Sequence, residues 1–220
     1  MENSTIIRVA DLVNENPNAA VVFKKYNIDF CCKGKRPLSE ACEKAGISEE
    51  TIYNEIRNLS QKTGGNLRIH SWSDAMICDY LINNHHNYIR EVTPQILALS
   101  HKVASRHGEN HPELVDVYHK FSQLSQELMN HMEKEEQQMF PAIKNNSLTN
   151  QLVGEIESEH EEAGDLMAEI NHLTDTYIPP ADACTSYRML FKLLEEFEDD
   201  LHQHVHVENN ILIPKATLGS

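Results

Sequence analysis

From residue 69 onward, apolar positions recur every three or four residues, and no stretch shows the alternation expected of a β-strand. This periodicity predicts four long helices, over about residues 71–106, 112–146, 148–173 and 182–214. The connections between them are short and contain Gly, Pro or Asn, which favours antiparallel neighbours. We therefore expect an all-α fold built on an up-down-up-down four-helix bundle.

The N-terminal part of the chain has a different pattern. Shorter amphipathic stretches at residues 9–14, 19–26, 38–45 and 49–59 predict a small helical domain. The composition changes near residues 61–66 (QKTGGN), because the chain holds 13 histidines and none lies before His70. We place a domain boundary at this linker-like segment, which gives a helical domain at 1–62 and the bundle at 67–216.

The apolar face of each long helix includes polar residues. The predicted faces are Ala75, Asp79, Ile82, His86, Ile89 and Ile96; Leu114, Val117, Phe121, Leu124, Leu128, His131 and Glu135; Leu152, Ile156, His160, Ala163, Met167 and Ile170; and Tyr187, Leu190, Leu194, Phe197, Leu201, His204, Glu208 and Ile211. Burying a carboxylate without a partner costs free energy. A metal ion is the simplest explanation for an imidazole and a carboxylate one turn apart on a buried face.

The ligand candidates also match in height along the bundle. The stretch from His86 to Arg106 is almost as long as the stretch from Pro112 to His131. The stretches from His131 to Asn145 and from Leu148 to His160 match in the same way. The third helix is nine residues short of the fourth, about 14 Å at the helical rise, a distance that an extended loop over residues 174–181 can span.

The predicted ligands are His86, His131, Glu135, His160, His204 and Glu208. Nitrogen and oxygen donors without thiolate suit iron or manganese, and two carboxylates suit bridges between two metal ions. We therefore expect two iron ions, with two histidines for each ion and both glutamates as bridges. The competing interpretation is a chain that is merely rich in surface histidine, but chance would not place these residues at one level of the bundle.

The remaining histidines and two nearby glutamates are weaker candidates. His107 shares the phase of His86 but lies about 31 Å from it on a continuous helix, so we leave it out as a ligand, with a tuning role or a second weak site open. The other histidines of this group are expected to be solvated, with His85 able to flank the site: His85, His101, His111, His119, His172, His202 and His206. Glu127 and Glu159 lie near ligand histidines and could orient them or relay protons, although surface glutamates are the simpler interpretation.

Adjacent cysteines form the second chemical feature. Cys31 and Cys32 precede Lys33, Lys35 and Arg36, and nearby cations favour thiolate character and metal affinity. A disulfide between neighbouring residues would be strained, so we expect two thiols or an exchangeable pair. The alternative is that one cysteine packs in the small core and the other is incidental.

Composition narrows the function classes. The chain has 220 residues and a formal net charge of -15, which argues against nucleic acid or an anionic membrane as the main partner. Five cysteines are an odd number, which does not suit a secreted disulfide framework. We see no signal peptide and no apolar run long enough to span a membrane, so the expected compartment is the cytoplasm.

Four motifs together resemble the iron–sulfur cluster repair family of hemerythrin-like di-iron proteins. They are KYNIDFCCKG (25–34), HMEKEE (131–136), ESEHEEAG (157–164) and HVHVENNILIP (204–214). The resemblance implies two iron ions, oxo- and carboxylate-bridged, and repair or protection of iron–sulfur clusters damaged by nitric oxide or oxidative stress. It also implies that Cys31 and Cys32 are functional, receiving iron, delivering it or supplying electrons.

One departure from the oxygen-carrying hemerythrins is informative. Those proteins carry a histidine one turn after the third-helix ligand, where this chain has Gly164. One iron should therefore have an open position, which favours reaction or metal loss over oxygen carriage.

Three functional hypotheses remain at this point. The first is a stress-response repair protein that donates iron, reduces nitric oxide, or both, with damaged iron–sulfur proteins and nitric oxide or dioxygen species as partners. The second is a module that binds or senses oxygen or nitric oxide without turnover. Iron storage ranks lowest, since one site holds only two ions. A thiol-linked homodimer is conceivable, but nothing in the sequence requires it.

Overall fold

The computed structural model describes residues 6–60 and 69–218 of the chain. Within these ranges most residues are helical and no strand occurs, apart from an isolated bridge between Arg8 and Pro37. The predicted all-α class is confirmed. The contacts of the chain divide it into two compact units, Met1–Ser73 with Val205–Ser220, and Asp74–His204. The linker predicted at 61–66 lies outside the described residues.

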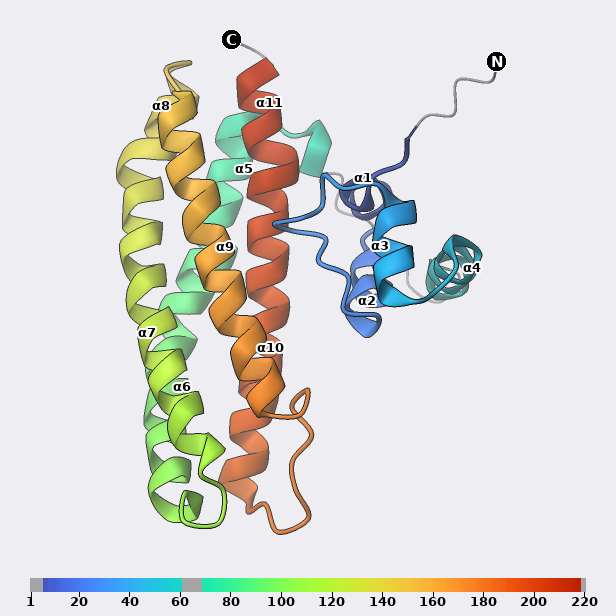
Figure 1. Cartoon of the computed structure of the whole chain (residues 1–220). Helices are drawn as coiled ribbons and strands as arrows, with labels where there is room; N and C mark the ends of the chain where they lie inside the picture. The colour runs from blue at the N-terminus through green and yellow to red at the C-terminus, as the bar shows by residue number, and fades with distance from the viewer. Residues whose placement is uncertain (1–5, 61–68, 219–220) are drawn as a thin grey trace. The chain divides into compact units, whose positions relative to one another are not determined.

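The second unit consists of long helical runs that lie side by side (Figure 1). The first run joins α5 (Asp74–Tyr80), the π-helical η2 (Leu81–His86) and α6 (Asn87–His107). The next joins α7 (Glu113–Lys134), the π-helical η3 (Glu135–Met139) and α8 (Phe140–Lys144), and it is followed by α9 (Asn150–Leu173) and α10 (Thr185–Val207). Helix α7 packs against both α6 and α9, as expected for consecutive antiparallel helices.

The core of this unit follows the apolar faces predicted for the second, third and fourth helices, except that Leu152 is half-buried. The prediction for Ile211 is also wrong, since Ile211 is half-buried and Leu212 is buried instead. All seven predicted positions of α7 and its continuation are buried, from Leu114 to Glu135. Phe121 of α7 and Phe197 of α10 meet edge to face, with ring centroids 5.1 Å apart, and both are fully buried. These contacts pack together the helices that carry the candidate ligands.

The face predicted for the first helix is wrong before His86. Ala75 and Asp79 are exposed and Ile82 is half-buried, whereas Leu81 lies in the core together with Ile77 and Cys78. The cause is η2, because a π turn contains more residues than an α turn and so shifts the buried face. The step from His86 back to the next buried apolar residue is therefore five positions, not four.

The first unit contains the four short helices predicted for the N-terminal domain. They are α1 (Val9–Glu15), α2 (Asn18–Lys25), α3 (Leu38–Ala45) and α4 (Glu49–Ser60), and a short 3-10 turn, η1 (Ile69–Ser71), follows. The unit also includes the C-terminal η4 (Glu208–Leu212) and α11 (Ile213–Leu218).

The prediction that the last helix stops at Pro214 is wrong, because α11 continues to Leu218. Proline lacks an N–H and is tolerated in the first turn of a helix. Its ring leaves the Asn210 carbonyl without the usual helical donor, and the side-chain amide of Asn14 donates to that oxygen at 3.5 Å. This bond connects α1 to the C-terminal segment. Among the described residues, no helix has the length and apolar character needed to cross a membrane.

Candidate metal centre

Glu135 lies at the centre of the site. It is the first residue of η3, is fully buried, and has its carboxylate among four imidazole rings. Its Oε1 atom is 3.1 Å from Nε2 of His131 and 3.7 Å from Nε2 of His160. Its Oε2 atom is 3.3 Å from Nε2 of His86 and 3.9 Å from Nε2 of His204. Each oxygen thus faces one pair of histidines, which is the arrangement of a bridging carboxylate.

The histidines of each pair point their Nε2 atoms at one another. These atoms are 3.2 Å apart for His86 and His204, and 3.0 Å apart for His131 and His160. Bonds of about 2.1 Å from two imidazoles to one metal at a right angle would place the nitrogens about 3.0 Å apart. One ligand atom each from His86, Glu135 and His204 lies within 4.8 Å of the others, and the same holds for His131, Glu135 and His160. The donor set therefore fits two metal ions that share Glu135.

Glu208 is the remaining predicted ligand. It is fully buried and begins η4, four residues after His204 on the same uninterrupted helical run. Residues four apart on a helix share a face. Glu208 therefore follows His204 as Glu135 follows His131, and each glutamate starts a π-helical segment. Its role as a sixth ligand stays a prediction.

Nitrogen and oxygen donors without thiolate suit iron. Because the donors are buried, the negative charge of Glu135 needs a nearby positive charge. Burial alone would lower the pKa of His131, but the charge of Glu135 and hydrogen bonds to Glu135 and Glu159 raise it to about 9. Burial opposes ionisation of Glu135, yet the charge of His131 and the surrounding imidazoles hold its pKa well below the usual range. Metal binding must therefore displace a proton from the His131–Glu135 pair.

Carboxylates outside the site fix two of the imidazole rings. His86 Nδ1 donates to Glu136 Oε1 at 2.7 Å, and Arg90 donates to the same oxygen at 2.7 Å. His131 Nδ1 donates to Glu159 Oε2 at 2.8 Å, and Lys134 also donates to Glu159. Such bonds fix the tautomer and leave Nε2 available to a metal.

Sequence reasoning named Glu159 among two weak candidates and missed Glu136. The signal available for Glu136 was chemical, since a ligand histidine generally needs a carboxylate or carbonyl for its second nitrogen. The other weak candidate, Glu127, accepts a hydrogen bond from Gln123 one turn earlier on α7.

Two histidines predicted to be solvated are buried instead. His85 donates from Nδ1 to Asp200 at 2.9 Å and stacks on His204 at 5.5 Å between centroids, so it flanks the site. His206 Nε2 lies at hydrogen-bond distance, 3.0 Å, from Asn14 Oδ1, and burial lowers its pKa to about 4. His206 is buried because it packs against Phe30 and Asn14 within the first unit. His107 lies outside the groups that could hold a metal, with Nε2 3.2 Å from Cys184 Sγ.

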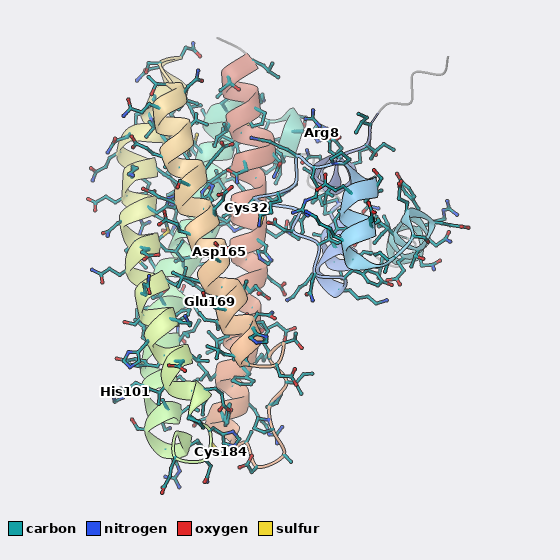
Figure 2. All side chains as sticks on the ribbon, viewed as in Figure 1. Arg8, Cys32, His101, Asp165, Glu169 and Cys184 are labelled. Carbon is teal, nitrogen blue, oxygen red and sulfur yellow. The ribbon has the colours of Figure 1, made fainter. Side chains whose placement is uncertain are left out.

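The vicinal cysteines lie in the loop between α2 and α3 of the first unit (Figure 2). Asp29 Oδ1 accepts the backbone N–H groups of Cys31 and Cys32, both at 3.0 Å, and the Cys31 thiol at 3.3 Å. The two sulfurs are 3.9 Å apart and form no disulfide. Asp29, Cys31 and Cys32 offer ligand atoms within 4.8 Å of one another, which makes them a small candidate metal site.

The thiolate-favouring effect expected from nearby lysines does not hold at Cys31. The hydrogen bond with Cys32, burial, and the charge of Asp29 raise the pKa of the Cys31 thiol well above its ordinary value. The loop backbone is fixed by Asn210, whose amide donates to the Cys31 carbonyl at 2.9 Å. Gly34 is required here, because a Cβ atom would lie 2.3 Å from the Phe30 carbonyl oxygen.

Comparisons with known proteins cover both parts of the chain. Residues 79–216 match the family described as the hemerythrin HHE cation binding domain, and residues 7–60 match ScdA_N, a domain of unknown function. The iron-sulfur cluster repair protein ScdA of Staphylococcus haemolyticus is 31% identical over 94% of this chain and 96% of its own length. A probable iron-sulfur cluster repair protein of Haemophilus influenzae is 34% identical (95% and 96%), and the iron-sulfur cluster repair protein YtfE of an Enterobacter species is 35% identical (96% of each).

Proposed function

The chain belongs to the family of iron–sulfur cluster repair proteins with a hemerythrin HHE domain, and on that premise we propose that it repairs clusters damaged by nitric oxide or oxidative stress. We place this activity in the cytoplasm, with damaged iron–sulfur proteins as the partners. The observation that carries the proposal is the carboxylate of Glu135 between two pairs of converging imidazoles.

In the proposed centre His86 and His204 would hold one iron ion, His131 and His160 would hold the other, and Glu135 and Glu208 would supply the shared carboxylate ligands. Bound iron would have two roles: it would be the source of iron for rebuilding a cluster, and it would be a redox centre that reacts with nitric oxide. Glu136 and Glu159 hold the Nδ1 protons of His86 and His131, so that both rings present Nε2 inward.

Iron donation is the version of the mechanism that the electrostatics favour. The pKa of His131 is raised to about 9 beside Glu135. Without iron, His131 Nε2 would carry a proton at neutral pH and form an ion pair with Glu135. This ion pair would neutralise the buried carboxylate and so lower the free-energy cost of giving up the metal.

The thiol site of the first unit is suited to accept iron that the bundle releases. Asp29, Cys31 and Cys32 present one oxygen and two sulfurs, a softer donor set than the imidazoles and carboxylates of the bundle. The raised pKa keeps Cys31 protonated until a metal displaces its proton. We propose that these residues hold iron transiently during delivery.

The test is reactivation of an enzyme whose [4Fe–4S] cluster has been damaged by nitric oxide, incubated anaerobically with the iron-loaded protein. Recovery of activity with matching loss of iron from the repair protein is expected. The Glu135→Ala variant, treated in the same way, serves as the control with reduced iron loading. If activity does not return and iron stays bound, donation is wrong. Nitrous oxide release from the reduced protein would then support nitric oxide reduction, and nitric oxide binding without product would support a sensing module.

A further inference from the structure

A cysteine and a histidine meet at the opposite end of the second unit from the π-helical segment that begins at Glu135. Cys184 directly precedes α10, and His107 is the last residue of α6. Cys184 Sγ and His107 Nε2 are 3.2 Å apart, which is hydrogen-bond distance for a thiol that donates to an imidazole. Figure 2 labels Cys184 at this end of the bundle, where Figure 1 also shows the turn between α6 and α7. Neither residue belongs to the metal site.

The thiol lies beside the start of a long helix and close in sequence to two cationic contacts. The thiol lies at the N-terminus of a 23-residue helix, where backbone N–H groups and the helix dipole favour negative charge. Lys102 Nζ donates to Ser186 in the first turn of α10 at 3.3 Å. Arg188, one turn after Cys184, donates to the carbonyls of Pro180 and Ala181 at 3.4 Å. Cations and helix N-termini are the features that activate cysteines.

The acidic residue nearest to Cys184 in the sequence is hydrogen-bonded to a histidine. Asp182 lies two residues before Cys184, and its carboxylate accepts from His111 Nε2 at 3.1 Å. That hydrogen bond holds the pKa of Asp182 low and fixes the start of α10 to the α6–α7 turn. The loop that carries Cys184 is therefore anchored independently of the thiol, and Cys184 itself can react without releasing that anchor.

The other cysteines have different environments. Cys42 and Cys78 are buried, and Cys31 is buried with a raised pKa, whereas Cys184 is half-buried. Cys32 is also half-buried, and its sulfur lies beside the thiol of Cys31. Cys184 combines partial exposure with an imidazole nitrogen at hydrogen-bond distance from its sulfur.

We propose that Cys184 is a nucleophilic thiol that His107 activates for exchange with small disulfides of the glutathione class. His107 Nε2 takes the thiol proton, and the Cys184 sulfur attacks one sulfur of the disulfide. The S–S bond of the small disulfide breaks, a mixed disulfide with Cys184 forms, and the departing thiolate takes up the proton. One thiol and one disulfide are consumed and one of each is formed, so no other oxidant is needed. This site is independent of the metal centre and of the proposed repair function.

The experiment exposes the iron-loaded full-length protein to oxidised glutathione at pH 7 and measures the mixed disulfide at each cysteine by peptide mass spectrometry. An ordinary cysteine is only a few per cent thiolate at this pH. Because His107 takes the thiol proton as the sulfur attacks, we expect Cys184 to react about tenfold faster than the same cysteine in the chain unfolded by guanidinium. His107→Gln should remove that advantage. The matched control is His101→Gln, since His101 lies on α6 with an exposed side chain (Figure 2) and should leave the rate unchanged.

Circular dichroism and iron content establish that each variant is folded. Should His107→Gln not fold, the comparison between the native and the unfolded wild-type chain decides by itself. A native rate at Cys184 no higher than the unfolded rate overturns the proposal. An undiminished rate in a folded His107→Gln variant overturns the role of His107.

Discussion

Glu136→Gln should weaken iron binding without touching any ligand. Glu136 accepts from His86 Nδ1 and from Arg90, each at 2.7 Å, and these bonds hold its pKa below the usual range despite partial burial. The substitution removes the negative charge but keeps an oxygen that can accept the imidazole N–H. His86 then loses both basicity and part of its orientation.

The expected loss follows from the type of bond removed. Outer carboxylates of metal-bound histidines typically contribute about 10- to 100-fold in metal affinity. Because glutamine retains one neutral acceptor, and a charge-assisted bond is roughly twice as strong as a neutral one, we expect the lower end, about tenfold or about 1.4 kcal/mol. Glu136→Ala, which removes the acceptor, should approach about 100-fold.

The assay is an anaerobic titration of ferrous iron against a chromophoric chelator at pH 7. Glu133→Gln is the matched control, since Glu133 lies on the same helix with an exposed side chain and accepts from Gln137 at 2.8 Å. The Glu133→Gln substitution removes the same negative charge, but away from the ligand imidazoles. If the two variants lose equal affinity, the effect is one of net charge, and orientation of His86 by Glu136 is refuted.

Three further results are expected. Glu135→Ala should reduce iron from about two ions per chain to less than one by elemental analysis, because both imidazole pairs share this carboxylate; two bound ions would contradict the bridge. The hydrogen bond with Asp182 raises the pKa of His111, so the stability it contributes is present below about pH 6.5 and is lost as the pH rises through the raised pKa. Denaturant titrations from pH 6 to 8 should show a fall of about 1 kcal/mol or less that His111→Gln abolishes. Phe121→Ala should cost about 3–5 kcal/mol in the metal-free protein by the same method, because the ring packs on Phe197; a loss below about 1 kcal/mol would contradict that packing.

Periodicity predicted the helices and placed Glu135 and the four candidate histidines at one level, because both depend on phase and on residue counts. His131 and His160 lie where α7 and α9 place them by counting residues from a shared turn, and their Nε2 atoms are 3.0 Å apart. The same counting could not find Glu136, which lies off the apolar face and reaches His86 from its outer side. It also could not find the Cys184–His107 contact, since that depends on how the loop after α9 returns to the bundle.

The first helix shows where a fixed period fails. A step of four from His86 predicted Ile82 in the core, whereas the buried residue is Leu81. The π turn of η2 adds one residue to the helical period, and it also lets the neighbours His85 and His86 both be buried. Helix propensity does not predict such a turn, because the turn is stabilised by the packing of His85 and His86 against neighbouring helices.

The two candidate carboxylate ligands share a longer pattern that explains two of the three π segments in the described part of the chain. His131, Glu135 and Pro141 have the same spacing as His204, Glu208 and Pro214. In each case the π segment begins at the glutamate and ends two residues before the proline. Proline cannot donate to the carbonyl four residues earlier, which removes the α-helical bond that would compete with a wider turn.

No proline follows η2 at that spacing, so proline is not required for a π turn. What the three segments share is a candidate ligand at one end, which is His86, Glu135 or Glu208. A wider turn rotates the residues beyond the ligand relative to the residues before it. The helix can then place an imidazole or carboxylate in the centre and still return apolar residues to the core on the far side. The π segments are therefore the means by which long regular helices accommodate a polar metal site without losing their apolar packing.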